Sequence, residues 1–376
     1  MKIVYCIAKT HGSGGMERVL SMKANYLVEH GHEIVIITTD QRGLKSFFML
    51  DDRIKCYDLA INYEENNGKS FVNKALNYPI KQRKHKRRLT ALLKEQQADI
   101  VISMFCNEAS FITEIKDGSK KILEVHFSKL KRLQYGRKGL WALSDELRSK
   151  MDDKLVLRFD KFVVLTREDA QLWGAIPNLE VIPNPCPFKE TKSALLENKR
   201  AVAVGRYEYQ KGFDLLIEAW SIVHQTYPDW HLDILGEGHL KHELEQQIYR
   251  LGLQESVSLE LPTIHLDDVY LRSSLLVMSS RYEGFGMVLI EAQSFGIPVV
   301  SFACKCGPRD IISGGIDGLL VPEENVEQLA TAIMELIEHD DLRKYMGAAA
   351  KDNSVRFSIE QIMEKWLKLF EQITNT

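Results

Sequence analysis

The chain has 376 residues, of which 45% are hydrophobic and 27% are charged. This is the composition of an ordinary globular protein, and it excludes a disordered, collagen-like or membrane-embedded chain. The net charge of -3 hides an uneven distribution, because residues 1–186 hold 31 Lys and Arg against 23 Asp and Glu, a balance of +8. The remaining residues carry a balance of -11. A basic first half suits an anionic partner, and the length predicts two domains or three.

Short apolar runs rich in β-branched residues alternate with longer amphipathic segments along the first half of the chain. Several runs are apolar on both faces, which is typical of strands in a buried parallel sheet. Helices are predicted between them, among others over Met16–His30, Leu89–Gln97 and Arg167–Gly174. The predicted strands of this half are Lys2–Ala8, Glu33–Asp40, Ile54–Ala60, Asp99–Phe105, Lys121–Phe127, Lys161–Thr166 and Leu179–Pro183.

The same alternation restarts after three prolines, Pro183, Pro185 and Pro187, which continue neither a helix nor a central strand. A helix is predicted over Phe213–Tyr227. Two consecutive βα series predict two doubly wound α/β domains, with bounds at 1–184 and 185–357. The predicted strands of the second series are Ala201–Arg206, His231–Leu235, Val257–Leu261, Leu275–Ser279 and Pro298–Phe302.

The C-terminal residues 358–376 are predicted to form a helix with a broad apolar stripe. Such a stripe must be covered, and in a two-lobed protein the last helix can return to the first lobe. We therefore assign this helix to the first domain. The stripe consists of Ile359, Ile362, Met363, Trp366, Phe370 and Ile373.

The six cysteines form neither a CxxC pair nor a zinc-ligand spacing, so they are expected to be reduced thiols, most of them buried. The apolar run after Met1 is too short for a secretory signal, and no apolar stretch reaches the ~20 residues that span a bilayer. We expect a cytoplasmic protein, with peripheral attachment to the inner face of the cell membrane as an open alternative.

A glycine-rich turn, Gly12-Ser13-Gly14-Gly15, follows the first predicted strand and opens the first helix. Glycines let backbone N–H groups approach an anion, and a helix N-terminus adds partial positive charge. A dinucleotide site, with Asp40 binding a ribose, is one interpretation, and a plain structural turn is another. The third glycine of the dinucleotide pattern would fall at Glu17, which disfavours that interpretation.

Two strand-end turns in the second half carry groups suited to a diphosphate. Gly205-Arg206 follows a predicted strand, and Lys211-Gly212 opens the next helix. Two cations at the carboxyl end of a strand match the two or three negative charges of a diphosphate. The next strand ends in Leu235-Gly236-Glu237-Gly238, where glycines again permit close approach. A solvated loop pair is the alternative.

A third segment places two carboxylates near one glycine-rich turn. Glu283 lies in the turn, and Glu291 lies about one turn into the helix that follows. Carboxylates accept hydrogen bonds from sugar hydroxyls, and amides at a helix start bind phosphate. The alternative is that Glu291 only solvates its helix. The amides in question belong to Gly284, Phe285, Gly286, Met287 and Val288.

These motifs occur in one order that resembles the family-4 retaining glycosyltransferases of the GT-B fold. They are Gly205-Arg206 with Lys211-Gly212, the 235–238 turn, Glu283-x7-Glu291 and Gly318-Leu319-Leu320-Val321-Pro322. The resemblance covers nearly the whole chain and is closest to the branch that builds bacterial surface or lipid-linked glycans. It implies two Rossmann-like domains facing each other across a cleft. One departure is Asp310, which stands where that branch usually has Glu.

The resemblance implies a role for each motif. Arg206 and Lys211 would bind the donor diphosphate, Glu283 the transferred sugar and Glu291 the ribose. His126, at the end of a predicted strand, matches a histidine that contacts the donor sugar. The remaining donor-binding positions are Gly14, Gly15, Gly205, Gly236, Gly284, Phe285, Gly286, Met287 and Val288. The donor would be a nucleotide-sugar, most simply a UDP-hexose or UDP-N-acetylhexosamine, with neither cofactor nor metal.

A basic segment, Lys81–Arg88, holds six cations in eight residues. Pro79 is predicted to start its helix, with His85, Leu89, Leu92 and Gln96 turned inward. Lys81, Arg83, Lys84, Arg87 and Arg88 would then face an anionic membrane or a lipid-diphosphate acceptor. A solvated face stays open as an alternative, whereas nucleic acid is disfavoured because no recognition motif accompanies the run. A second cluster comprises Lys129, Lys131, Arg132, Arg137 and Lys138, ahead of Leu140-Trp141.

The sequence therefore predicts a retaining glycosyltransferase that moves a sugar to a glycan or lipid-linked acceptor in cell-surface polysaccharide synthesis. Two rivals remain. A sugar-nucleotide epimerase of the same fold would share the donor contacts and need no acceptor. A sugar-binding module without catalysis would more often be exported.

Overall fold

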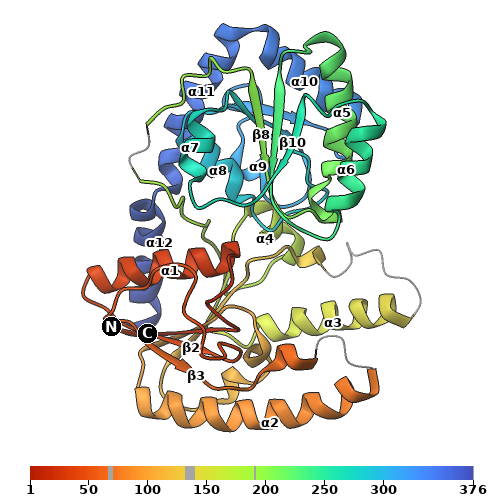
Figure 1. The fold of residues 1–376 in the computed structure, drawn as a ribbon. Coiled ribbons are helices and arrows are strands. Elements are labelled where there is room, and N and C mark those ends of the chain that lie inside the picture. The colour runs from red at the N-terminus through yellow and green to blue at the C-terminus, as the bar shows by residue number, and fades with distance from the viewer. Residues whose placement is uncertain (67–70, 132–139, 190–191, 376) are drawn as a thin grey trace. The chain divides into compact units, whose positions relative to one another are not determined.

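The computed structural model describes residues 1–66, 71–131, 140–189 and 192–375. The chain divides into two compact units, one made of Met1–Pro187 with Ile359–Thr376 and the other of Phe188–Ser358. Each unit holds one parallel β-sheet with helices on both faces (Figure 1). The predicted class, doubly wound α/β in both halves, is confirmed.

The first unit contains a seven-stranded sheet in the order β3-β2-β1-β4-β5-β6-β7, and all of its strand pairs are parallel. The central strands are buried on both faces, as their continuous apolar sequences predict. Only β3 at the edge is largely exposed. The strands are β1 (Lys2–Ile7), β2 (Glu33–Thr38), β3 (Lys55–Asp58), β4 (Ile100–Ser103), β5 (Lys120–Glu124), β6 (Lys161–Val164) and β7 (Leu179–Val181).

Helices cover both faces of this sheet. On one face, α1 (Gly15–Glu29) and α12 (Ile359–Thr374) share a core with Ile3, Tyr5 and Ile7 of β1. On the other face, residues of α2 (Phe71–Gln96), α3 (Leu140–Val156) and α4 (Arg167–Trp173) form a second core. Figure 1 shows α1 and α2 on opposite sides of the strands.

The C-terminal helix α12 belongs to the first unit and contacts α1. Every residue of its predicted apolar stripe is buried, from Ile359 to Ile373, and Leu369 joins them. Burial of this stripe explains why a helix at the end of the chain packs on strands from its beginning.

The helix of the basic segment begins earlier than predicted. We expected Pro79 to start it, but α2 begins at Phe71 and runs for 26 residues with Pro79 inside. A proline inside a helix removes one backbone hydrogen bond and crowds the carbonyl group four residues earlier, which is why a helix start was predicted there. Pro79 is exposed. The inward stripe is confirmed for His85, Leu89 and Gln96, whereas Leu92 is half-buried and Leu93 is fully buried.

The second unit contains a six-stranded parallel sheet in the order β10-β9-β8-β11-β12-β13. Its main core packs one face against α5 (Phe213–Thr226), α6 (Lys241–Arg250) and α10 (Val326–Glu338). The strands are β8 (Arg200–Val204), β9 (His231–Leu235), β10 (Val257–Glu260), β11 (Leu275–Met278), β12 (Val299–Phe302) and β13 (Gly318–Val321).

The remaining helices include α7 (Leu266–Leu271), α8 (Met287–Ser294), α9 (Pro308–Ile311) and α11 (Asp340–Ser354). Figure 1 shows α7 and α8 on the side of the strands opposite α5 and α6. All the predicted strands are present, with ends shifted by at most three residues. Strand β13 was not predicted, because its four residues had been interpreted as part of a motif.

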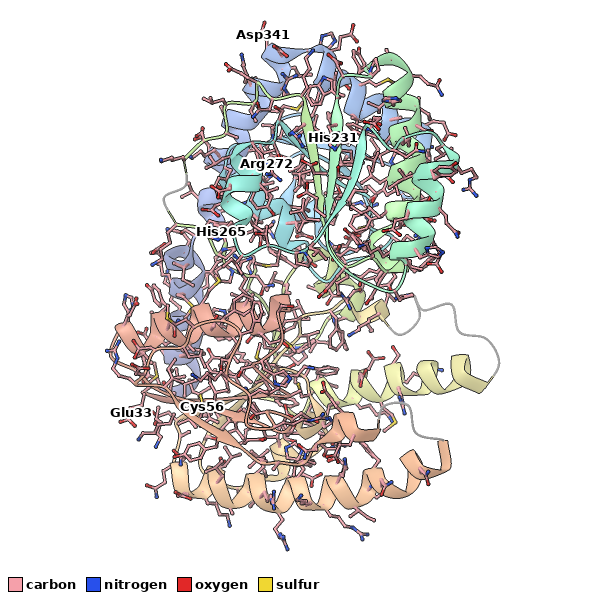
Figure 2. The ribbon with its side chains drawn as sticks, in the orientation of Figure 1. Glu33, Cys56, His231, His265, Arg272 and Asp341 are labelled. Carbon is pink, nitrogen blue, oxygen red and sulfur yellow. The ribbon has the colours of Figure 1, made fainter. Side chains whose placement is uncertain are left out.

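Four of the six cysteines are buried. Cys6, Cys186, Cys304 and Cys306 are buried and Cys106 is half-buried, whereas Cys56 lies exposed on the edge strand β3 (Figure 2). Within the residues that the structure describes, no helix is both long and apolar enough to cross a membrane.

Candidate active site

Two loops of the second unit bring several of the predicted donor-binding residues together. The first loop, 205–212, follows β8, and the second, 279–286, follows β11. These strands are neighbours in the sheet and run parallel, so their carboxyl ends meet at one edge. In open α/β sheets this edge is where ligands bind.

Lys211 and Glu283 form an ion pair between these two loops. Lys211 Nζ donates to Glu283 Oε1 at 2.7 Å, and Ser280 Oγ donates to the same oxygen at 2.6 Å. The side chains are 16% and 7% exposed, respectively. A charge pair that is shielded but still reachable at a strand end is suited to contact with a polar ligand.

Further hydrogen bonds fasten the two loops to each other. The Arg281 N–H donates to Gln210 O at 2.8 Å, Gln210 Nε2 donates to Tyr282 O at 3.0 Å, and Ser279 Oγ donates to Lys211 O at 2.9 Å. These bonds fix the backbone around Lys211, so the ammonium is held in place by more than its ion pair.

The guanidinium of Arg281 completes this link. It donates two hydrogen bonds to the carboxylate of Asp214, at 2.9 and 2.6 Å, and one to Tyr209 O at 2.8 Å. It also lies 4.0 Å from the centre of the Tyr209 ring. Because Asp214 lies in the first turn of α5, this contact joins the loop after β11 to the helix that follows the loop after β8.

Two glycines are required by close backbone contacts at this edge. A Cβ added to Gly212, which has φ +60°, would lie 2.1 Å from the carbonyl oxygen of Ser279. A Cβ on Gly236 would lie 1.8 Å from the carbonyl oxygen of Gly205. Any side chain at these positions would push the strand-end turns apart.

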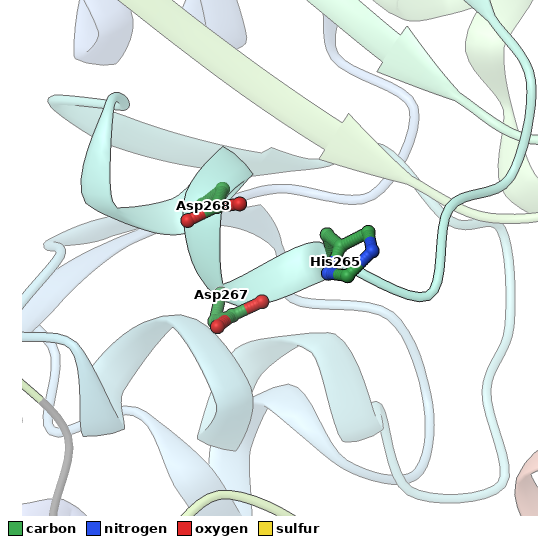
Figure 3. Close-up of side chains that lie close together, drawn as sticks. All are labelled: His265, Asp267 and Asp268. Carbon is green, nitrogen blue, oxygen red and sulfur yellow. The ribbon is translucent and has the colours of Figure 1, made fainter.

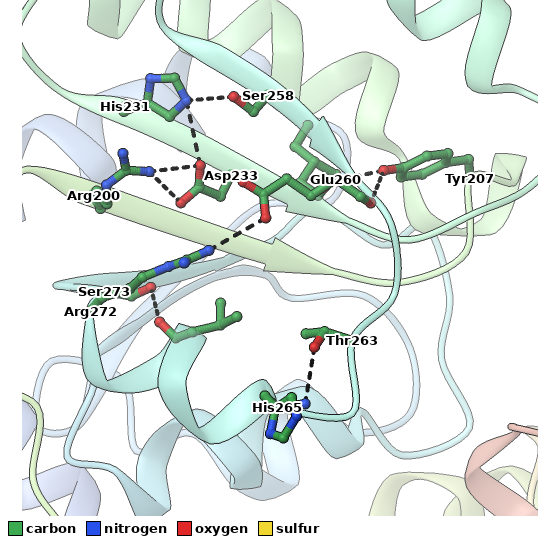
Figure 4. Close-up of polar contacts among 12 residues, drawn as sticks. Arg200, Tyr207, His231, Asp233, Ser258, Glu260, Thr263, His265, Arg272 and Ser273 are labelled. Atoms are coloured by element: carbon green, nitrogen blue, oxygen red, sulfur yellow. Dashed lines mark hydrogen bonds and ion pairs between the residues drawn. The ribbon is translucent and has the colours of Figure 1, made fainter. Parts of the chain in front are cut away.

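Arg206 differs from Lys211 in its surroundings. Its guanidinium is 64% exposed and donates to Glu208 Oε1 at 3.0 Å. The neighbouring Tyr207 is buried, and its hydroxyl donates to the carbonyl oxygens of Ile234 and Glu260 at 2.9 and 2.8 Å (Figure 4). Tyr207 therefore anchors the turn to β9 and β10 and leaves Arg206 directed at solvent.

Glu291 is placed in α8 and is 3% exposed. The hydroxyl of Tyr270, from α7, donates to its Oε2 at 2.8 Å. Gly286 precedes the helix with φ +96°, a left-handed conformation that favours glycine. The segment Gly284 to Val288 therefore leads directly into the helix, whose first N–H groups have no carbonyl partner within the helix.

His126 belongs to the first unit and lies two residues after the end of β5. Its Nε2 is 3.2 Å from Glu124 Oε1, at ion-pair distance, and its side chain is 7% exposed. Lys23 Nζ donates to both oxygens of Glu124 at 2.7 Å. Burial raises the pKa of Glu124, but attraction to Lys23 and His126 outweighs burial and lowers it to about 2.

The glycine turn before α1 is exposed at Gly14 and Gly15. A Cβ on Gly14 would lie 2.5 Å from Glu17 Oε2, so the Glu17 carboxylate folds over the turn. Asp40 is buried, and its oxygens accept from Thr39 Oγ1 at 2.7 Å and from the Glu64 N–H at 2.8 Å. Glu17 therefore covers the glycine turn, and the Asp40 carboxylate is already hydrogen-bonded within the protein. Both observations argue against a dinucleotide site.

The five cations of α2 that were predicted to face a membrane or acceptor fall into two sets, while Lys86 pairs with Glu114. Lys81, Lys84 and Arg88 donate to backbone carbonyl oxygens of residues 59–62 and so hold that loop. Arg83 and Arg87 are exposed, and neither has a polar partner among the residues that the structure describes. The two free arginines are four residues apart and therefore lie on one helix face.

The second basic cluster is described only in part. Lys129 Nζ lies 2.8 Å from Asp153 Oδ1, and Lys131 Nζ lies 4.5 Å from the centre of the Phe127 ring. Arg132, Arg137 and Lys138, together with the side chains of Leu140 and Trp141, lie outside the described residues.

One surface group in the described chain resembles a cation site in composition. His265, Asp267 and Asp268, at the start of α7, place one ligand atom each within 4.8 Å of the others (Figure 3). All three are exposed, and exposed acidic groups gather frequently without an ion. We assign no metal to this group.

Two parallel-sheet halves with strand-end loops of this kind are the halves of the GT-B fold, and comparisons with known proteins add that the activity is that of a glycosyltransferase. The family model "Glycosyltransferase Family 4" matches residues 13–188, and "Glycosyl transferases group 1" matches residues 188–353. The chain belongs to the family-4 glycosyltransferases.

Three relatives show the extent of the similarity. An uncharacterized glycosyltransferase of Haemophilus influenzae is 30% identical over 97% of this chain and 98% of its own. An α-1,4-N-acetyl-D-galactosaminyltransferase of Campylobacter jejuni, named for an undecaprenol-diphosphate-linked substrate, is 26% identical over 100% of this chain and 99% of its own. A TarM variant of S. aureus, solved with UDP, has a TM-score of 0.82 at 18% identity, over 98% of this chain and 99% of that chain.

Several contacts of the site were not predicted from the sequence. Arg281, Gln210 and Tyr270 hold predicted residues in place, but they reach them through the tertiary fold and leave no local pattern. Glu124 did leave a signal, because it is a charged residue at an inward position of an apolar strand. Lys23 likewise interrupts the apolar stripe of α1.

Proposed function

We propose that this glycosyltransferase moves a sugar, with retention of anomeric configuration, from a UDP-sugar to a glycan or lipid-linked acceptor in cell-surface polysaccharide synthesis. The donor would be a UDP-hexose or UDP-N-acetylhexosamine. The ion pair of Lys211 with Glu283, between two strand-end loops, is the single observation that carries the proposal. It sets a cation for the leaving diphosphate beside a carboxylate for the sugar hydroxyls.

The chemistry follows from charge separation. As the bond between the sugar and the diphosphate breaks, negative charge grows on the diphosphate and positive charge grows on the sugar ring. A fixed ammonium at Lys211 stabilises the first charge, and its hydrogen-bonded backbone spares the cost of reorganisation. Glu283, anchored by Ser280, accepts hydrogen bonds from the sugar.

Other residues would hold the rest of the donor. Arg206, largely exposed and bonded to Glu208, would exchange that carboxylate for the diphosphate when the donor is bound. Glu291 binds the ribose hydroxyls, and the amides at the start of α8 bind a phosphate. The family resemblance assigns His126 to the sugar and Gly14 and Gly15 to the phosphates, and this requires the Glu17 carboxylate to turn away from Gly14. The same site requires neither a cofactor nor a metal in this proposal.

The acceptor assignment rests on charge. The first 186 residues carry a balance of +8, and α2 exposes Arg83 and Arg87, which have no polar partner within the described part of the chain. The Campylobacter jejuni relative is named for an acceptor that carries an undecaprenol diphosphate. An anionic lipid-diphosphate, presented at the inner face of the cell membrane to a cytoplasmic enzyme, would match both observations.

A donor panel separates this function from its rivals. The protein is incubated with UDP- and GDP-sugars, with and without a lipid-diphosphate acceptor. Nucleotide release that depends on the acceptor supports transfer, with the anomeric configuration of the product read by NMR. Interconversion of the donor alone would indicate an epimerase, and binding without turnover would indicate a sugar-binding module.

A further inference from the structure

A charged group lies inside the apolar layer between the first sheet and the helices α1 and α12. Lys23 and Glu124 have side chains that are each 1% exposed. Their neighbours in the same layer are apolar, among them Leu20 and Ala24 on α1 and Ile122 on β5. Lys23 interrupts the inward stripe of its helix, and Glu124 shares the inward face of β5 with Ile122.

The contacts of Lys23 are short hydrogen bonds, whereas His126 Nε2 lies at ion-pair distance from Glu124 and is buried without a hydrogen-bond partner among the described residues. Lys23 Nζ donates to both oxygens of Glu124 at 2.7 Å and lies 3.5 Å from the centre of the Trp366 ring. Trp366 comes from α12, so the ammonium is enclosed by a carboxylate on one side and an aromatic face on another. Glu124 Oε1 then lies 3.2 Å from His126 Nε2.

Stability alone does not account for such a pair. Removing two charges from water costs several kcal/mol per ion, and apolar residues of similar size often serve a core equally well or better. The pair instead lies at the carboxyl end of β5, where α/β proteins bind ligands, and it touches the one residue of that strand end that is assigned to the sugar.

We propose that Lys23 and Glu124 are positioning residues, which hold the imidazole of His126 in the place and charge environment that the donor sugar meets. This inference rests on the proposed function, because it takes His126 as the residue facing the sugar. Glu124 lies at ion-pair distance from Nε2, and Lys23 holds both oxygens of the Glu124 carboxylate in place. Trp366, on α12, covers the Lys23 ammonium with its ring.

Two variants test the role. In Glu124→Gln the side chain keeps its shape but loses its charge, so the imidazole NMR signals of His126, assigned with His126→Asn, are expected to change. Turnover of the UDP-sugar is expected to fall about 10-fold or more, with the donor KM altered by less than about 3-fold, because an orienting partner is lost. Unchanged His126 signals would overturn the proposal.

The double variant Lys23→Met with Glu124→Leu separates positioning from stability. Two apolar side chains of similar size fill the same space, so its thermal midpoint is expected to stay close to that of the unchanged protein. Turnover is nevertheless expected to be as low as in Glu124→Gln. A double variant with normal turnover would show that the pair only packs the core, and would overturn the proposal.

The NMR comparison of Glu124→Gln with the unchanged protein requires no nucleotide-sugar. Its result therefore tests this inference separately from the proposed function. If Glu124→Gln changes the His126 signals while His126→Asn leaves turnover normal, the contact is supported and the assignment of His126 to the sugar fails. If the unchanged protein transfers no sugar from any donor, the proposed function fails, and the signals still decide whether Glu124 holds the imidazole.

Discussion

Lys211 owes its position to hydrogen bonds and an ion pair between its own loop and the loop after β11, which is distant in the sequence. Hydrogen bonds of the Ser279 and Gln210 side chains join the loop 205–212 to the loop 279–286. Glu283 Oε1 accepts from Lys211 Nζ at 2.7 Å. The sequence predicted that Lys211 and Glu283 both follow strands, which was sufficient to bring them to one edge. It could not predict that they pair, because the pairing depends on the order of β8 and β11 in the sheet.

Replacing Lys211 tests the diphosphate role at the scale of one residue. Lys211→Ala is expected to lower turnover by about 10²–10³, because a fixed charge that stabilises the transition state is removed. Steady-state kinetics measure the loss, and a thermal melt reports whether Glu283, left without its partner, destabilises the fold. The control is Lys199→Ala, which removes an exposed lysine paired with Asp229. Near-normal turnover of Lys211→Ala would contradict the role.

Glu108 gives a pH-dependent prediction. It is buried after β4, with Ser103 Oγ donating to its Oε1 at 2.6 Å, and burial raises its pKa from the ordinary 4.5 to about 7. The folded protein thus binds a proton more tightly than the unfolded chain. The stabilisation is complete below about pH 4.5 and is lost as the pH rises through 7.

Glu108→Gln removes this titration while keeping the shape of the side chain. At pH 8 the variant is expected to have a higher free energy of unfolding than the unchanged protein, by on the order of 2–3 kcal/mol. Near pH 4.5 the difference should approach zero. Denaturant unfolding at a series of pH values measures it, and a difference that does not vary with pH would contradict the assignment.

At the scale of elements, α2 shows how one helix serves two purposes. His85 and Leu89 turn inward, and burial lowers the pKa of His85 to about 4, so it is neutral in the core near pH 7. Lys81, Lys84 and Arg88 hold the loop at residues 59–62. The periodicity predicted the inward face, but the division of the cations depends on where that loop lies, which the sequence does not state.

This division predicts which cations bind a membrane. Arg83→Ala with Arg87→Ala is expected to reduce sedimentation with vesicles containing anionic lipid, because each exposed cation contributes about 1 kcal/mol at such a surface. The matched variant Lys84→Ala with Arg88→Ala removes the same charge from the loop-binding set. It is expected to lower the thermal midpoint and to affect vesicle binding less. Equal binding by both variants and the unchanged protein would exclude α2 as the membrane contact.

At the scale of the molecule, each unit has its own core around one fully buried tryptophan. Trp366 of α12 lies in the core of the first unit, and Trp220 of α5 in that of the second. The two βα series predicted the two units, and the apolar stripe of the last helix predicted that it is covered. The structure shows that the last helix returns to the first unit and packs against α1. No local sequence pattern encodes that partner.

The two tryptophans allow each unit to be perturbed separately. Trp366→Ala and Trp220→Ala are each expected to cost about 3–5 kcal/mol, because a buried indole is replaced by a cavity. Their effects on UDP binding should differ. Trp220 anchors α5 in the core, and α5 begins beside Lys211. Trp220→Ala is therefore expected to weaken the binding of UDP, measured by isothermal titration calorimetry. Trp366→Ala is expected to keep the UDP affinity and to lose turnover, because Lys23 no longer meets an aromatic ring.

Calorimetry of the same two variants supplies the control. Ligand at about 100 times its Kd stabilises the protein that binds it by about 2.7 kcal/mol, so UDP should raise the unfolding midpoint of Trp366→Ala as it raises that of the unchanged protein. Loss of UDP binding in Trp366→Ala, measured where the variant is still folded, would contradict the assignment of most nucleotide contacts to residues 188–358, since Trp366 belongs to the other unit.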